Sequence, residues 1–414
     1  MKFVRQALDA VEKRFFAEGK PLARLYPLYD AADTFFFTPN AKTSGTCAVR
    51  DCVDFKRMMI TVVLALLPCA LMGMYNVGFQ ANSLIKPDAN GALVGVPSDW
   101  HGAILNAISG FYPAIFEPSS VVGCFLYGLV YFLPIYIVTM IVGLGWEILF
   151  ASINKHEVNE GFFVTGFLFP LIVPATIPLW QVALAISFGG VIGKEIFGGT
   201  GRNFMNPALV ARAFLFFAYA GQISGDQVWT AVDGVSKATP LSYASQGVDA
   251  LSAQYSMSSA FFGTIPGSLG ETSTLACLIG AAILLLTGVA SWRIMASMFV
   301  GGMGLAAIFA GCPSITEAFP AATLGPQWHF VLGGFAFGMV FMATDPVTAA
   351  ATKVGQYIYG FLIGALIIVV RAMNPAYPEG AMLVILFGNC VAPLIDYMVV
   401  NANIRRRVKR LEAR

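Results

Sequence analysis

Three carboxylates in this sequence stand at the ends of long apolar runs, where an uncompensated charge is costly to bury. They are Glu147, Asp345 and Asp396. A hard cation such as sodium prefers oxygen ligands, so these carboxylates could form an uptake path for such an ion. The competing interpretation is that each one pairs with a nearby arginine or lysine. We predict no tightly bound metal, because Cys47 and Cys52 have no second pair and no nearby histidine to complete a site.

The apolar runs themselves indicate the class of protein. Of the 414 residues, 57% are hydrophobic and 12% are charged, about half the charged share of a soluble domain. These values exclude an ordinary soluble domain and a disordered chain. A membrane-crossing helix needs about 20 mostly apolar residues. Read in this way, the sequence predicts an all-α polytopic membrane protein with about ten crossings: 58–78, 119–151, 161–176, 178–193, 207–223, 273–290, 294–311, 330–343, 356–370 and 381–400.

Positive charge is concentrated at the two ends of the chain. Ten of the 25 lysines and arginines lie in 1–57, and six more lie in 404–414. By the positive-inside rule both termini are then cytoplasmic, as an even number of crossings requires. We therefore interpret 1–57 as a cytoplasmic amphipathic arm, 401–414 as a basic cytoplasmic tail and 224–272 as an outer loop. Arg212 lies about one turn into its crossing, so we expect its side chain to extend to the cytoplasmic interface.

An internal repeat divides the membrane part into two halves. The tetrapeptide Met-Asn-Pro-Ala at 205–208 recurs at 373–376, and the same offset superposes several Phe, Gly and Pro positions of 162–178 on 330–346. The copies are five crossings apart, so we predict two inverted five-helix repeats, 58–223 and 273–400. Glycine and proline around each copy predict broken or re-entrant helices that line a ligand or ion path. The alternative is a pair of ordinary helix starts with proline in the first turn.

Three motifs together carry a family resemblance. The outer loop contains Asp-Gly-Val-Ser-Lys-Ala-Thr-Pro at 233–240, which taken alone is a common kind of turn. With His-Glu-Val-Asn-Glu-Gly-Phe-Phe at 156–163 and Gly-Lys-Glu-Ile-Phe-Gly-Gly-Thr-Gly at 193–201, it resembles the NqrB/RnfD family over nearly the whole chain. The NqrB members belong to bacterial sodium-translocating NADH:quinone oxidoreductases, and the RnfD members belong to Rnf ferredoxin:NAD oxidoreductases. The long arm 1–57 is typical of the quinone-reducing members.

The resemblance implies a membrane subunit of a six-subunit, redox-driven sodium pump in the bacterial inner membrane. Its partners would be the subunits A, C, D, E and F, and its membrane fold would be similar to that of ammonium and urea channels. A dedicated transferase would join FMN through a phosphoester to Thr239 on the outer, periplasmic side. The flavin signal of the family matches Asp233, Ser236, Ala238 and Thr239 here, with Lys237 where the signal usually has glycine. Lys237 could pair with the flavin phosphate, or it could hinder the transferase.

The resemblance also implies non-covalent riboflavin, ubiquinone as the electron acceptor and sodium as the transported ion. For the quinone pocket it points to five residues near the cytoplasmic ends of the second and third crossings: Gly143, Glu147, Glu160, Phe162 and Phe163. Small and aromatic residues suit a flat ring and a carboxylate can supply protons, whereas core packing is the alternative for the phenylalanines. Leu144 replaces the second glycine of the family's Gly-Gly pair. For riboflavin, Asn203 and Asn206 offer amide donors and acceptors, or they cap a broken helix.

Two other functions stay open at this stage. One is an RnfD-type subunit of an ion-translocating ferredoxin:NAD oxidoreductase, and the other is a passive channel or transporter on the same scaffold. A plain transporter gives no reason for a flavin-acceptor loop. No Gly-x-Gly-x-x-Gly fingerprint follows a predicted strand, so we expect a partner subunit to oxidise NADH. No nucleic-acid partner is expected.

Overall fold

The computed structural model describes residues 55–87, 93–154, 161–223, 230–233, 238–374 and 379–412, with residues 5, 10–12, 14, 26 and 29 of the N-terminal arm. Within these residues the regular structure is helical, apart from two short antiparallel strands, β1 (Lys86–Pro87) and β2 (Leu93–Val94). This confirms the all-α class. Three residues of the predicted sites lie outside the described residues: Glu160, Ser236 and Lys237.

Six of the described helices are long and apolar enough to cross a membrane. They are α3 (Phe55–Asn82), α5 (Val121–Asn154), α7 (Leu179–Gly193) with the short turn η4 (Glu195–Phe197), α14 (Trp292–Gly311), α18 (Lys353–Met373) and α19 (Ala381–Glu412). Each coincides with a predicted crossing. Many of their Leu, Ile, Val and Phe side chains point outward and are exposed, as expected for helices whose outer face meets lipid.

The other predicted crossings are short or interrupted. α6 (Gly161–Leu171), α8 (Pro207–Ala218) and α13 (Thr274–Leu286) each end before the predicted limit. Pro174 and Pro178 follow α6 closely, and the residue before a proline disfavours helical backbone. The segment predicted as one helix over 330–343 consists of α16 (Pro326–Val331), α17 (Phe335–Phe337) and the π-helical turn η6 (Gly338–Met342). Gly333, with φ of +59°, separates α16 from α17.

The two copies of the tetrapeptide occupy different positions in their helices. In the first copy Asn206 is the N-cap residue of α8, and Pro207 is its first residue. In the second copy Met373 ends α18 and Asn374 is its C-cap residue. The next helix, α19, begins only at Ala381. The described residues therefore show a helix start at the first copy, while residues 375 and 376 of the second copy lie outside them.

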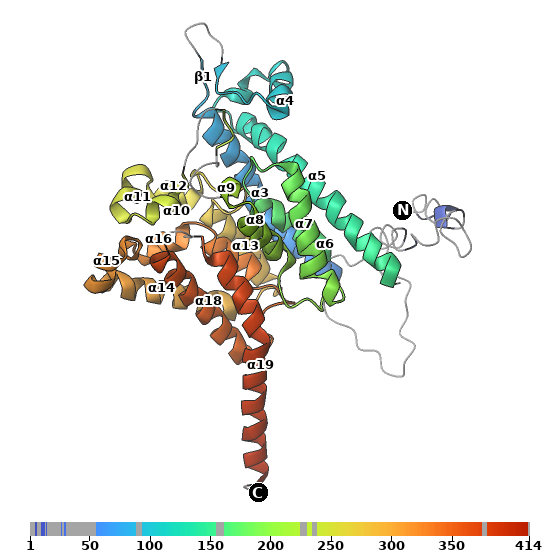
Figure 1. Cartoon of the computed structure of the whole chain (residues 1–414), viewed down its shortest axis with the longest axis vertical. Helices are drawn as coiled ribbons and strands as arrows, with labels where there is room; N and C mark the ends of the chain where they lie inside the picture. Colours follow the sequence, from blue (N-terminus) through green and yellow to red (C-terminus); the bar gives the residue numbers. More distant parts are fainter. Residues whose placement is uncertain are drawn as a thin grey trace.

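The membrane part packs as two groups of helices (Figure 1). α3 lies along α5 and α7 along α8, while α14 lies along α18. Glycines allow some of these close approaches: a Cβ at Gly128 of α5 would overlap the backbone of Met74 in α3. α19 does not end near residue 400 but continues as a helix to Glu412, so most of the predicted basic tail is a helical projection from the body (Figure 1).

The segments between the long helices carry shorter ones. α4 (Trp100–Ser109) and the turn η3 (Pro113–Phe116) precede α5, and α9 (Ala220–Ile223) follows α8. α10 (Pro240–Ala244), α11 (Val248–Gln254) and α12 (Met257–Phe262) lie between α9 and α13, and α15 (Pro313–Ala318) with the turn η5 (Pro320–Thr323) lies between α14 and α16. α10, α11 and α12 lie together with α16 at the left of the view (Figure 1).

Candidate functional site

A cavity of about 70 Å³ opens between α3, α6, α8, α13 and η6. We call it the Asp345 cavity, and it is lined by Thr165, Lys194, Asn203, Asn206 and Asp345, among others. The riboflavin candidates Asn203 and Asn206 therefore meet the sodium candidate Asp345 in one place. The space is enough for several water-sized groups, since one water needs about 10–15 Å³ on this scale.

The Asp345 carboxylate accepts hydrogen bonds from the two residues that follow it by two and three positions and from the N-cap residue of α8. Its Oδ1 accepts a hydrogen bond from the Val347 amide at 3.1 Å, and its Oδ2 accepts one from the Thr348 hydroxyl at 2.9 Å. The side-chain Nδ2 of Asn206 also donates to Oδ2, at 3.4 Å. Among the described residues, the ion pairs do not include Asp345. A carboxylate that lines a cavity without a cationic partner can act as an oxygen ligand for a cation.

The side chains of Asn203 and Asn206 also form hydrogen bonds with nearby backbone groups. Asn206 Oδ1 accepts a hydrogen bond from the Ala208 amide at 3.0 Å and so caps α8. Asn203 accepts one from the Gly201 amide at 3.2 Å and donates one to the Met205 carbonyl at 2.9 Å. The capping alternative is thus observed for Asn206. The Thr200 hydroxyl beside them is buried and has no hydrogen-bond partner among the described residues, so an acceptor or donor of a ligand could still pair with it.

A buried ion pair stands next to this cavity. Glu147 of α5 pairs with Lys194, the C-cap residue of α7. Lys194 Nζ also lies 3.8 Å from Glu195 Oε1, and all three side chains are almost fully buried. Of the two interpretations given by the sequence, the structure therefore shows the second for Glu147: its carboxylate pairs with a lysine. Lys194 stands within one of the family motifs, but the sequence offers no sign of which carboxylate it meets.

The quinone candidates converge only in part. Gly143 lies one turn before Glu147 on α5, and the ring of Phe162 packs against it so closely that a Cβ at 143 would overlap the ring. Lys194 Nζ lies 6.0 Å from the centroid of the same ring. Phe162 is 2% exposed, whereas Phe163 is 40% exposed. Gly143, Glu147 and Phe162 therefore form one cluster, and Phe163 lies outside it.

We expect Gly143→Ala to destabilise the protein because the added methyl group must displace the Phe162 ring. Overpacking of this kind typically costs about 1–3 kcal/mol. Gly145→Ala is the matched control on the same helix, since nothing lies within 4 Å of a Cβ at 145. Thermal unfolding of the purified protein compares the two. Equal melting temperatures for both variants would contradict the tight contact.

Asp396 occupies a third environment. It accepts hydrogen bonds from the Ala351 amide at 2.7 Å, the Thr352 amide at 2.9 Å and the Thr352 hydroxyl at 2.5 Å. It thereby joins α19 to the start of α18. Asp396 does not line the Asp345 cavity. The three carboxylates that the sequence offers for one cation path thus have three separate sets of partners.

A second cavity, of about 60 Å³, lies under the flavin-signal residue Thr239. We call it the Thr239 cavity, and Arg212, Glu271 and Glu379 also line it. Thr239 is the N-cap residue of α10, but its side chain makes no capping hydrogen bond. A flavin acceptor on an outer loop would be expected to expose its hydroxyl, whereas Thr239 is 6% exposed here. Thr239 therefore lines a cavity and is largely shielded from bulk solvent.

Asp233 is held by hydrogen bonds to residues that follow β2. Its Oδ2 accepts a hydrogen bond from the Ser98 amide at 2.7 Å, and its own amide donates to the Gly95 carbonyl at 3.2 Å. Ala238 directly precedes Thr239 and is the acceptor of a 3.5 Å hydrogen bond from the Tyr255 hydroxyl. These hydrogen bonds fix Asp233 and Ala238, the described residues on either side of 234–237.

The Thr239 cavity is charged. Arg212 Nη2 lies 3.3 Å from Glu379 Oε2, which corrects the expectation that Arg212 extends to the cytoplasmic interface. Glu271 belongs to the segment between α12 and α13, which folds back against the bundle. Burial raises the pKa of Glu271 to about 7, with a further increase from Glu379 and an opposing effect of Arg212. Near neutral pH Glu271 is therefore partly protonated.

Hydrogen bonds hold the segment that carries Glu271. The side-chain amide of Asn76 donates to the Ile265 carbonyl at 2.8 Å, and that of Gln80 donates to the Thr264 carbonyl at 2.9 Å. The Gly270 amide donates to the Leu171 carbonyl at the end of α6, at 2.7 Å. The end of the interrupted helix α6 thus finds its partner in this segment, as backbone groups inside a membrane must.

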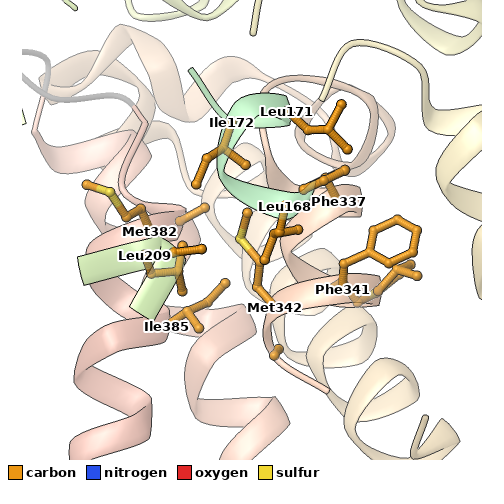
Figure 2. Packing of buried hydrophobic residues seen from close by; sticks show 14 of the residues in the cluster. Leu168, Leu171, Ile172, Leu209, Phe337, Phe341, Met342, Met382 and Ile385 are labelled. Atoms are coloured by element: carbon orange, nitrogen blue, oxygen red, sulfur yellow. The ribbon is translucent and has the colours of Figure 1, made fainter. Parts of the chain in front are cut away.

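An apolar layer of buried side chains connects the linings of the two cavities. Leu168 and Phe341 line the Asp345 cavity, while Leu209 and Met342 line the Thr239 cavity. All four belong to one cluster of buried residues, and the labelled side chains from α6, α8, η6 and α19 pack against one another there (Figure 2). A charged ion could pass between the cavities only if this layer opened.

Comparison with known proteins gives a consistent result. The sequence profile of the NQR2, RnfD, RnfE family matches residues 42–405. The NqrB subunit of the Na(+)-translocating NADH-quinone reductase of Chromohalobacter salexigens is 55% identical over 98% of this chain and 96% of its own length. The corresponding proteins from Stutzerimonas stutzeri and Pseudomonas aeruginosa are 53% and 52% identical over 98% of this chain and 99% of their own lengths. The resemblance found in the sequence motifs is therefore confirmed, and the chain belongs to the NQR2, RnfD, RnfE family of multi-pass membrane proteins.

Proposed function

We propose that this chain is the NqrB subunit of a Na+-translocating NADH:ubiquinone reductase, through which electrons reach ubiquinone while sodium is exported. The observation that carries the proposal is an identity of 52–55% to NqrB relatives over 98% of the chain. The Rnf-type alternative receives no comparable support from these relatives. The six long apolar helices accord with a membrane subunit.

Thr239 is the proposed attachment site of FMN. Three observations support it: the match to the flavin signal, a hydroxyl that is not used for helix capping, and a neighbouring arginine that could face a phosphate. Bound FMN would supply one- and two-electron redox chemistry. Asp233 would hold the loop in place through Ser98 and Gly95, and Ser236 and Ala238 would complete the signal read by the flavin transferase.

The proposed sodium path runs from the Asp345 cavity through the apolar layer toward the Thr239 cavity. Asp345 would offer its carboxylate oxygens to the ion, since it has no cationic partner among the described residues. Glu147 is already neutralised by Lys194, and Asp396 is bound to the start of α18. We therefore place the main sodium contact of this chain at Asp345, with Glu147 and Asp396 in supporting positions.

We expect Asp345→Asn to raise the sodium concentration for half-maximal quinone reduction about tenfold, which corresponds to ~1.4 kcal/mol of lost binding free energy. The loss of one charged ligand is the physical reason. Asp396→Asn is the comparison and should raise this concentration less, because the Asp396 side chain bonds the start of α18 and does not line the cavity. Turnover is measured against sodium concentration at saturating quinone. An unchanged half-saturation concentration in Asp345→Asn would remove Asp345 from the path.

The proposed quinone pocket uses the cluster of Gly143, Glu147 and Phe162, with Phe163 on its outer side and Glu160 nearby in the chain. The contact between Gly143 and Phe162 and the buried Glu147 support this placement. Asn203 and Asn206 remain the proposed riboflavin contacts. Their location in the Asp345 cavity and the unpartnered hydroxyl of Thr200, among the described residues, support a polar ligand there.

The proposed topology has both termini in the cytoplasm, two inverted five-helix repeats (58–223 and 273–400) and Thr239 on the periplasmic side of the inner membrane. The basic end of α19 projects from the body at the end opposite to α4 and β1 (Figure 1), which accords with the positive-inside rule. The other five subunits of the complex would surround the chain, and one of them would oxidise NADH.

The decisive test is the intact mass of the chain purified from its native host. The proposal predicts a chain heavier than the printed sequence by one FMN less one water, yellow when purified and fluorescent after denaturation. A passive channel on the same scaffold would be colourless and have the mass of the sequence alone. An unmodified, colourless chain would overturn the redox function.

A further inference from the structure

We propose that Arg212 binds the phosphate group of the flavin nucleotide esterified to Thr239, so that the Thr239 cavity is a phosphate site. The inference rests on the proposed attachment of FMN and adds the residue that would hold its charged end. Arg212 and Thr239 belong to different segments, α8 and the start of α10, and both line this cavity.

One nitrogen of the Arg212 guanidinium has no hydrogen-bond partner among the described residues. Arg212 is 5% exposed. Its Nη2 contacts Glu379, but its Nη1 is buried without a hydrogen-bond partner among the described residues. A buried N–H group without a hydrogen-bond partner destabilises the fold, and more so when it is charged. Such a group in a cavity therefore indicates an acceptor that binds there.

The size of the cavity indicates which part of the flavin nucleotide can fit inside it. A volume of about 60 Å³ holds several water-sized groups. A phosphate has that size, whereas the three-ring isoalloxazine is far larger. The phosphate would therefore enter the cavity with Thr239 Oγ1, and the ring would lie outside it, where electron partners can approach.

The charges of the cavity complement one negative charge. Arg212, Glu271 and Glu379 line the cavity, and Arg371 lies outside the lining but close enough to lower the pKa of Glu271. Arg371 is already committed, because its two terminal nitrogens donate to the His329 and Leu332 carbonyls at 2.8 and 2.9 Å. A partly protonated Glu271 leaves the group with a net positive charge near neutral pH. The phosphodiester that links FMN to a threonine carries a single negative charge.

Arg212 and Glu379 allow a test in which the two partners of one ion pair give opposite results. Arg212→Gln, Arg212→Lys and Glu379→Gln are made in the complete complex in a host that contains the transferase. The midpoint potential of the Thr239 flavin is then measured, together with the flavin fluorescence of this chain in a denaturing gel.

Loss of the positive charge should disfavour the reduced, more negative flavin, so Arg212→Gln should lower the midpoint potential. A tenfold weaker stabilisation of the one-electron-reduced form corresponds to about 59 mV. Glu379→Gln frees Arg212 from its acid and should raise the potential, and Arg212→Lys should stay close to the wild type. If Arg212→Gln does not assemble, the comparison of Arg212→Lys with Glu379→Gln still decides.

Two results would overturn the phosphate site. One is a wild-type midpoint potential in both Arg212→Gln and Glu379→Gln. The other is a shift of the same sign in both variants, as a general disturbance of the cavity would produce. A failure of the proposed function itself looks different, because the wild-type chain would then show no fluorescence in the denaturing gel.

Discussion

Replacing Thr239 by alanine is expected to abolish the flavin fluorescence of this chain in a denaturing gel. A phosphoester needs a hydroxyl oxygen, and alanine has none, so the loss should be complete rather than partial. The gel separates the subunits and removes every non-covalent flavin, so the remaining signal reports the covalent bond alone. In the structure the Thr239 hydroxyl makes no capping hydrogen bond to α10, so the alanine variant is expected to assemble normally.

Two controls define this result. Thr239→Ser keeps a hydroxyl in the same place and should retain fluorescence. Thr272→Ala removes a hydroxyl from the same cavity but outside the flavin signal, and it should leave the fluorescence unchanged. Fluorescence that persists in Thr239→Ala, with intact labelling in both controls, would place the covalent flavin on another residue.

Replacing Lys194 by methionine is expected to produce the largest loss of stability among single substitutions at the site. Lys194 is the cation shared by Glu147 and Glu195, and all three side chains are buried. Removal of one partner leaves an uncompensated buried charge, which typically costs about 3–5 kcal/mol. Thermal unfolding in a fixed detergent or in nanodiscs, with and without sodium, measures the effect.

The complementary variants separate charge from packing. Glu147→Gln leaves Lys194 with Glu195 at 3.8 Å, so its loss of stability should be smaller. The double variant Lys194→Met/Glu147→Met removes both ends of the pair and should recover much of the loss, because a buried ion pair is often replaceable by apolar residues. Lys353→Met changes an exposed lysine at the start of α18 and is the control. A melting temperature of Lys194→Met equal to that of the control would contradict the buried pair.

The sequence predicted the membrane class and the position of each long crossing well. Runs such as 58–78 and 381–400 became the helices α3 and α19, because hydrophobicity over a window of this length is sufficient to specify a spanning helix. The lengths were less predictable. α6 stops at Leu171, where its final carbonyl binds the Gly270 amide, and a partner about a hundred residues away in sequence is not visible to a local pattern.

The sequence by itself determined that the chain is helical, apolar and interrupted by Gly and Pro, and its motifs identified the family. These are local properties, so neighbouring residues specify them. The tertiary structure decided which charges meet. Lys194 pairs with Glu147 across 47 positions, Asn206 reaches Asp345 across 139, and Arg212 reaches Glu379 across 167. A charge buried within a membrane protein takes its partner from whichever helix packs beside it, so only the folded chain shows the two cavities and the apolar layer between them.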